Sequence, residues 1–99
     1  MATMTIYLED GFDHDRVVVT TGGHEQVEPD ATTRHQVGLA AVVEVDPPAG
    51  GPTTVRVALP ERGLETEVEV DPAATPYVRV NVADGSLTVV PQPAPPMFA

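Results

Sequence analysis

The chain has 99 residues, no cysteine and no lysine, and its 15 acidic residues are offset by five arginines only, which gives a formal net charge of −10. The lack of cysteine excludes thiolate catalysis, iron–sulfur clusters and cysteine-ligated zinc. The acidic surface disfavours nucleic acid and anionic membranes as partners. The length suits one domain, and the valine-rich composition predicts an aliphatic core.

The first half of the chain contains strand patterns of unequal strength. Apolar–polar alternation predicts a strand over residues 3–9, and a β-branched run predicts one over Arg16–Thr20 that is covered on both faces. Glu25–Ala31 is at most a short edge strand, because it contains a proline. A longer strand is expected over Arg34–Val45, with Gly38 marking a bulge or bend.

The second half has the clearest strand pattern. Alternation runs through residues 53–90 and is interrupted by turn signals at Pro60–Gly63 and at Asp84-Gly85. An Asp-Gly pair between alternating segments is typical of a two-residue hairpin. The link Asp71–Pro76 is long enough to carry the chain from one sheet to another.

These elements predict an all-β protein with about seven strands in an antiparallel β-sandwich, either immunoglobulin-like or transthyretin-like. We expect the sandwich to occupy residues 1–90. Residues 91–99 are rich in proline and are expected to form an extended tail that does not continue a strand.

Several short motifs together resemble those of a group of small, uncharacterised bacterial one-domain β-proteins of about this length. The motifs are Tyr7–Phe12, Thr32-Thr33, Gly38–Ala40, Asp46–Pro48, Leu59–Leu64, Tyr77 and Asp84-Gly85, followed by an aromatic C-terminal tail. The resemblance spans most of the chain and implies a freestanding one-domain protein. It implies no activity, cofactor or site residue.

One predicted turn gathers four potential metal ligands, which are Asp10, Asp13, Asp15 and His14. Carboxylates on a loop are the ligands that Ca²⁺ prefers, and histidines from different strands could converge on Zn²⁺ or Cu²⁺. The spacing does not match an EF-hand loop, and turn-capping aspartates or scattered surface histidines explain the pattern equally well.

The sequence contains no recognisable catalytic motif. Ser86 is the sole serine and lies in a predicted turn without the G-x-S-x-G context. There is no P-loop, dinucleotide fingerprint or H-E-x-x-H. We therefore expect a protein that is not an enzyme and has no cofactor.

Charged residues on the outward side of the second half form a possible recognition face. They are Arg56 and Arg79 with Glu65, Glu67 and Glu69, on strands that would be neighbours. The alternative is a solvated face whose cross-strand ion pairs set the register.

The C-terminal tail presents Met97 and Phe98 after Pro95 and Pro96. Such a segment could dock on a partner, fold back over its own sandwich or stay disordered. We expect an interaction module that binds a protein partner or a second copy through a strand edge or this tail. The alternatives are a metal-binding β-protein and a decoration or assembly subunit of a larger shell. The N-terminal segment lacks the basic and apolar regions of a signal peptide, so we expect a cytoplasmic protein.

Overall fold

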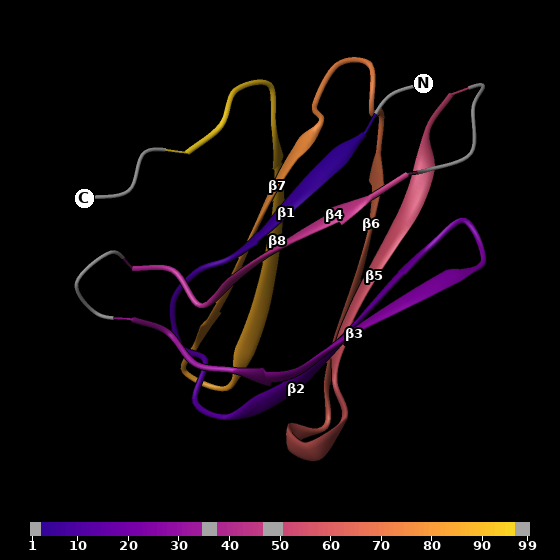
Figure 1. Cartoon of the computed structure of the whole chain (residues 1–99). Coiled ribbons are helices and arrows are strands. Elements are labelled where there is room, and N and C mark those ends of the chain that lie inside the picture. Colours follow the sequence, from indigo (N-terminus) through magenta and orange to yellow (C-terminus); the bar gives the residue numbers. More distant parts are fainter. Residues whose placement is uncertain (1–2, 35–37, 47–50, 97–99) are drawn as a thin grey trace.

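The computed structural model describes residues 3–34, 38–46 and 51–96, which form eight strands in two four-stranded sheets (Figure 1). The strands are β1 (Met4–Leu8), β2 (Asp15–Thr21), β3 (His24–Ala31), β4 (Ala41–Val45), β5 (Thr53–Leu59), β6 (Leu64–Val70), β7 (Tyr77–Ala83) and β8 (Ser86–Gln92), with a 3₁₀ turn η1 (Pro60–Arg62) between β5 and β6. The β1 sheet has the order β4-β1-β7-β8, and the β2 sheet has the order β3-β2-β5-β6.

The two sheets enclose one aliphatic core, so the all-β prediction and the sandwich-like layering agree with the structure. Its fully buried side chains alternate with outward-facing ones along each inner strand, as a half-buried strand requires. Burying a side chain of this kind contributes about 1.5–3 kcal/mol. The largest of them are Met4, Ile6, Leu8, Val17, Val19, Val55, Val57, Leu59, Val70, Val78 and Val80.

Pairing within the sheets is antiparallel except between β1 and β7, which run parallel. The link Asp71–Pro76 carries the chain from the β2 sheet to the β1 sheet, as expected, and the Thr5 N–H donates to the Pro76 carbonyl at 2.9 Å. The prediction of an antiparallel sandwich with about seven strands therefore differs from the structure in strand number and in this one parallel pair. A parallel pair requires a long crossover, and local sequence patterns do not reveal which strands it joins.

Tight turns close two of the hairpins, and the one at Asp84-Gly85 lies where the sequence predicts it. The turn between β2 and β3 is Gly22-Gly23, with φ of 56° and 83°, and the turn between β7 and β8 is Asp84-Gly85, with φ of 51° and 72°. Positive φ at both central residues is the condition for a two-residue hairpin turn that matches strand twist. Gly63 adopts the left-handed conformation at the end of η1, within the turn predicted over Pro60–Gly63.

Three strand predictions in the first half need correction. β2 alternates between buried and more exposed positions instead of being covered on both faces. β3 is a full eight-residue strand, because its proline, Pro29, lies where the register with β2 is irregular and a ladder bond is not required. The strand expected over Arg34–Val45 begins only at Ala41, since Arg34 and Leu39 close a turn through Gly38. Residues 35–37 of that prediction lie outside the described part of the chain.

The last strand is longer than the sequence indicates. β8 continues to Gln92, with Pro91 opposite Val78 and Gln92 opposite Tyr77 in the register with β7. Because β8 is an edge strand, a proline whose missing N–H faces away from β7 removes no ladder bond. Two residues of the segment expected as tail therefore belong to the sheet.

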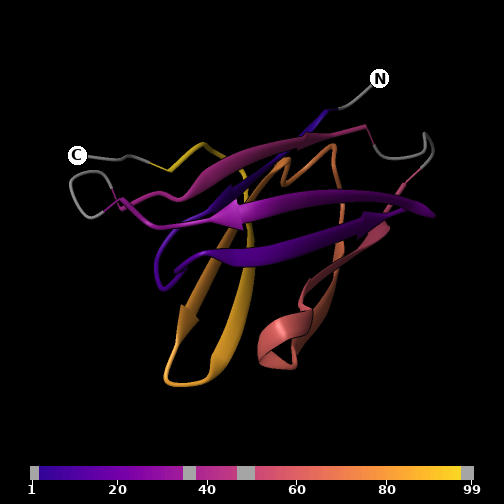
Figure 2. The same ribbon diagram turned by 60° about the horizontal axis from the view of Figure 1, so that its bottom comes forward.

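The two sheets meet differently along their two sides. On one side the edge strands β6 and β8 are bridged, because the Thr66 hydroxyl donates to the Leu87 carbonyl at 2.8 Å. On the other side, the edge strands β3 and β4 belong to different sheets and have no strand pairing with each other (Figure 2). No helix in the described part of the chain has the length and hydropathy needed to cross a membrane.

Candidate functional site

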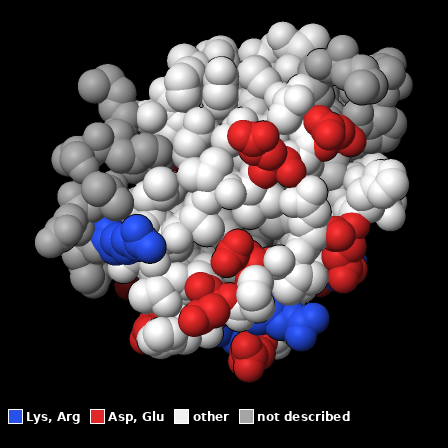
Figure 3. Space-filling view, viewed as in Figure 1, with Lys and Arg blue, Asp and Glu red and all other residues white. Residues whose placement is uncertain are grey.

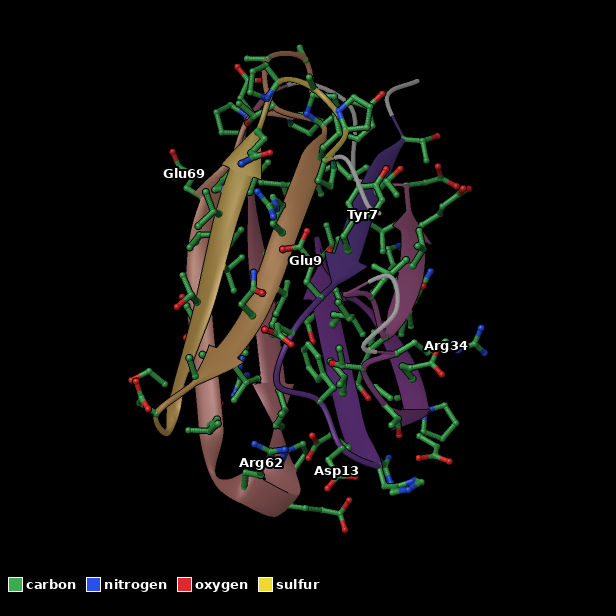
Figure 4. All side chains as sticks on the ribbon, turned by 90° about the vertical axis from the view of Figure 1, so that its left-hand side faces the viewer. Tyr7, Glu9, Asp13, Arg34, Arg62 and Glu69 are labelled. Carbon is green, nitrogen blue, oxygen red and sulfur yellow. The ribbon has the colours of Figure 1, made fainter. Side chains whose placement is uncertain are left out.

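The loop between β1 and β2 places the four predicted metal ligands close in sequence, but it directs them to different partners. Asp15 is buried and receives Arg62 in a two-pronged ion pair, with Nε donating to Oδ1 at 2.8 Å and Nη2 to Oδ2 at 2.7 Å. The Asp13 N–H also donates to Asp15 Oδ2 at 2.9 Å. Figure 4 shows Arg62 reaching from η1 toward the loop that carries Asp13. Both oxygens of Asp15 thus serve to anchor η1 to this loop.

His14 faces β3 instead of the other members of the set. Its Nδ1 lies 2.9 Å from Asp30 Oδ1, and its backbone N–H donates to the Thr32 hydroxyl at 2.9 Å. The hydrogen bond and the charge of Asp30 raise the pKa of His14 above its ordinary value, with a smaller contribution from Asp13. These contacts hold His14 at a φ of 50°, which is an energetically unfavourable backbone conformation for a residue other than glycine.

Within residues 3–34, 38–46 and 51–96, no group of three or more His, Asp or Glu side chains is placed to hold a metal ion. Asp10 remains exposed, and its carbonyl accepts the Val82 N–H at 2.9 Å. The described contacts of this turn are therefore structural contacts between β1, β2, β3, β7 and η1.

Glu9 is a buried acid that the sequence reading did not single out as a site residue. Its side chain is only 4% exposed although it lies on the outer face of the β1 sheet (Figure 4). Arg79 Nε donates to Glu9 Oε2 at 2.7 Å, and Asn81 Nδ2 donates to Oε1 at 2.8 Å. Thr33 covers the same segment, since its hydroxyl donates to the Glu9 carbonyl at 2.7 Å and accepts the Phe12 N–H.

The alternation of apolar and polar residues along β1 could have indicated this network. It places Thr5, Tyr7 and the following Glu9 on the same outer face of the sheet. Tyr7 and Tyr77 lie beside each other there, with ring centroids 6.4 Å apart. Burial, followed by the charges of Tyr77 and Glu44, raises the pKa of Tyr7. The outer face of the β1 sheet is thus a packed, hydrogen-bonded surface.

The predicted face of paired charges is divided between the two sheets. Arg56 on β5 forms an ion pair with Glu65 on β6 and lies opposite Glu67 in the register. Arg79 lies on β7 in the other sheet, where its partner is Glu9. An exposed pair such as Arg56–Glu65 contributes little to stability, and its main effect is to favour this register.

The tail residues predicted as a partner site are only partly within the described structure. Pro95 is exposed and Pro96 is half-buried, whereas Met97 and Phe98 lie outside the described residues.

The side of the sandwich between β3 and β4 is open among the residues that the structure describes, because no strand pairing closes it there. In β3, the side chains of residues 24–27 are all exposed, including Val27 at 41%. Figure 3 shows the face crossed by β3 and β4, with acidic residues spread over it and cations only at its margins. An edge strand with both faces exposed is a ready template for pairing with another chain.

A pocket of about 320 Å³ opens at one end of this side, where β3 begins and β4 ends. It is lined by Thr21, His24, Glu25, Gln26, Val45 and Asp46. The Thr21 hydroxyl is buried and has no hydrogen-bond partner among the described residues. A buried polar group left in this state costs about 1–3 kcal/mol.

No protein-family model, curated protein or solved structure matches the chain. Function is therefore inferred from the geometry of the described residues.

Proposed function

We propose that the protein is a non-enzymatic interaction module that accepts an extended segment of a partner protein along the free edge of β3. The observation that carries this proposal is that β3 has eight residues, a neighbouring strand on one side only within the described part of the chain, and side chains that are almost all exposed. Addition of a strand to an exposed sheet edge is a recurrent mode of peptide recognition, in which main-chain hydrogen bonds supply affinity.

The hairpin geometry indicates which backbone groups are free to bind. In the Gly22-Gly23 turn, the carbonyl of Thr21 faces the N–H of His24, its register partner. Because the direction of these groups alternates along a strand, the N–H and C=O groups of Glu25 and Val27 point away from β2. They form the row that an added strand would pair with.

Charge indicates what kind of segment fits. β3 carries Glu25, Glu28 and Asp30, and β4 with the residue after it carries Glu44 and Asp46; neither strand contains an arginine. Acidic side chains along an edge oppose pairing with an equally acidic strand, and they complement a basic one. The proposed partner is therefore an extended segment with cationic side chains.

The two edges of the β1 sheet offer less to a partner. On β8, the Leu87 carbonyl is already occupied by the Thr66 hydroxyl, and Pro91 lacks an N–H. β4 has only five residues. The geometry supports the strand-edge version of the interaction-module hypothesis, while the tail version depends on Met97 and Phe98, outside the described residues.

We assign the fold to the transthyretin-like alternative. In immunoglobulin constant-type domains, the first two strands lie in the same sheet, whereas here β1 and β2 lie in different sheets. The strand order thus supports the second of the two predicted arrangements. The proposed setting of the module is the cytoplasm.

The test uses a capped synthetic peptide of about seven residues that alternates Val and Arg, with a Val–Glu peptide of the same length for comparison. Calorimetry measures affinity, and amide chemical shifts show where the peptide binds. We expect the Val–Arg peptide to bind with shifts centred on residues 24–28, with affinity that falls as salt is added. The Val–Glu peptide should not bind.

Two proline variants make the test specific to the edge. Val27→Pro removes an N–H that points to the free edge and should abolish binding while the β2–β3 ladder stays intact. Glu67→Pro is the matched control on β6, the opposite edge of the same sheet. The N–H of Glu67 also points outward. The residue opposite it, Arg56, directs its own backbone N–H and C=O toward Thr20 of β2 and therefore away from β6. Equal loss of binding in both variants, or shifts centred away from β3, would contradict the proposal.

A further inference from the structure

β3 presents an apolar and an acidic side chain on the outer face of the β2 sheet. Val27 lies opposite Val18, and Glu25 lies opposite Thr20, in the register with β2. Val18 and Thr20 are half-buried positions that alternate with the buried ones of β2, so they and the residues opposite them project outward. A strand added to β3 would alternate in the same way, and its outward side chains would lie beside Val27 and Glu25.

Val27 is the last member of an apolar row that crosses the sheet. The row continues from Val27 to Val18 on β2 and to Ala58 on β5. Val18 and Ala58 are half-buried, whereas Val27 is 41% exposed. An apolar side chain on an added strand would cover the exposed side of Val27. Cross-strand pairs that include β-branched or aromatic residues stabilise a sheet in this way.

Glu25 is the last member of the neighbouring row, which continues through Thr20 to Arg56 on β5. The Arg56 guanidinium donates to Glu65 on β6, the strand on the other side of β5 from β2. Among the acids that raise the pKa of Arg56, Glu65 contributes most and Glu25 contributes least. Glu25 is exposed and makes no ion pair with another residue in the described part of the chain. A cation on an added strand could therefore pair with it.

The outer face also has room for a long side chain beside Glu25. A concavity of about 340 Å³ is lined by Glu25 together with the apolar side chains of Val18 and Ala58. Arg56 lines it as well, but its guanidinium is held by Glu65. Basic side chains place their methylene groups along apolar surface and keep the charged end in water. The surroundings of Glu25 suit such a side chain.

We propose that the strand which pairs with β3 runs antiparallel to it and carries, on its outward side, an apolar residue opposite Val27 and a basic residue opposite Glu25. The inference rests on the proposed function and names the sequence pattern that the edge selects. Antiparallel pairing is slightly more stable for each residue paired, and it fixes the order as apolar, any residue, basic. A register shifted by one residue would turn both side chains to the other face and lose both pairs.

The test compares two capped peptides of identical composition, each of about seven residues. One has Val-Thr-Arg at its centre and the other has Arg-Thr-Val, and threonine fills every other position. The two peptides therefore have the same charge and the same β-propensity, and they differ only in order. Calorimetry measures both affinities. We expect the Val-Thr-Arg peptide to bind about threefold or more tightly, because only this order makes both cross-strand pairs in antiparallel pairing.

Matched variants locate the effect on one face of β3. Glu25→Gln should weaken binding of the Val-Thr-Arg peptide. Glu28→Gln removes the same charge from the opposite face, where Glu28 lies opposite the buried Val17, and it should weaken binding less. Val27→Thr keeps a β-branched residue in the strand and should reduce the preference for Val-Thr-Arg over Arg-Thr-Val.

The outcomes separate the two proposals. If the two peptides bind equally and Val27→Pro still abolishes binding, the assigned pattern is overturned and the edge proposal stands. If neither peptide binds, the edge proposal fails and the pattern fails with it. Tighter binding of the Arg-Thr-Val peptide would overturn the antiparallel direction. Equal effects of Glu25→Gln and Glu28→Gln would mean diffuse charge attraction and would overturn the pairing with Glu25.

Discussion

Gly11 is the position where one methyl group should be most damaging, because the backbone of β7 passes directly beside it. A Cβ added there would lie 1.9 Å from the Val82 carbonyl oxygen, whereas real contacts are essentially never shorter than 3.0 Å. The φ of +87° is also strained for any residue with a side chain. Gly23 has nearly the same φ, +83°, and nothing within 4 Å of an added Cβ. The two glycines therefore separate steric overlap from backbone strain.

The expected magnitudes follow from these contacts. Both Gly→Ala substitutions carry a left-handed penalty of about 1–2 kcal/mol. Gly11→Ala must also displace the loop by roughly 1 Å. That weakens the hydrogen bond from the Val82 N–H to the Asp10 carbonyl and the one from Arg62 to the Gly11 carbonyl. At about 0.5–1.5 kcal/mol for each of the two hydrogen bonds, the total is about 2–5 kcal/mol, a large part of the about 5–15 kcal/mol that stabilises a typical domain.

The assay is urea unfolding followed by circular dichroism, with both variants compared with the unaltered chain. A slope of about 1–3 kcal/mol per molar urea converts the difference between the variants into a clearly resolved shift of the midpoint. We expect Gly11→Ala to unfold at a much lower urea concentration than Gly23→Ala. Equal midpoints for the two variants would refute the argument, because they would mean that the contact with Val82 carries no cost.

Two further predictions concern the ion pairs that hold the loop between β1 and β2. Arg62→Ala should destabilise the protein by about 2–3 kcal/mol, because it leaves a buried carboxylate with one remaining donor, discounted for the partial exposure of the arginine. Arg16→Ala, at an exposed arginine that makes no described ion pair, should change the unfolding free energy by less than about 0.5 kcal/mol; similar losses in the two variants would contradict the role of Arg62. NMR titration should find the pKa of His14 above about 6.5, and Asp30→Asn should lower it. Since the folded-state pKa is the raised one, the stabilising contribution of His14 is complete below about pH 6.5 and is lost as the pH rises through the folded-state value; an unchanged pKa in Asp30→Asn would rule out this pair as the cause.

Much of the local structure could be predicted from the sequence. Alternating residues in β5, β6, β7 and β8 define which side chains are buried, since a slip by one residue would expose the whole apolar set. The Asp84-Gly85 turn and the left-handed Gly63 were also predictable, because few residues adopt positive φ at low cost.

The candidate site was predicted less well. The aspartates of the loop after β1 were predicted as possible metal ligands. In the structure, Asp15 pairs with Arg62 and His14 contacts Asp30. The edge of β3 was underrated because Pro29 weakens the strand signal, although an edge strand tolerates a proline. The hydroxyl of Thr21, on the neighbouring strand β2, has no partner among the described residues; this has no sequence signature, since only the surroundings decide whether a hydroxyl finds a partner.

The sequence alone determined most of the strands, the inward faces of the second half and the turns at Pro60–Gly63 and Asp84-Gly85, because these depend on residues close together in the chain. Only the tertiary structure decided that β1 pairs in parallel with β7 and that β3 and β4 form the open side. It also decided the partners of the buried acids: Glu9 meets Arg79 across 70 residues of sequence, and Asp15 meets Arg62 across 47. The physical reason is that long-range pairs form only after the strand order is set, and the strand order minimises the free energy of the whole core.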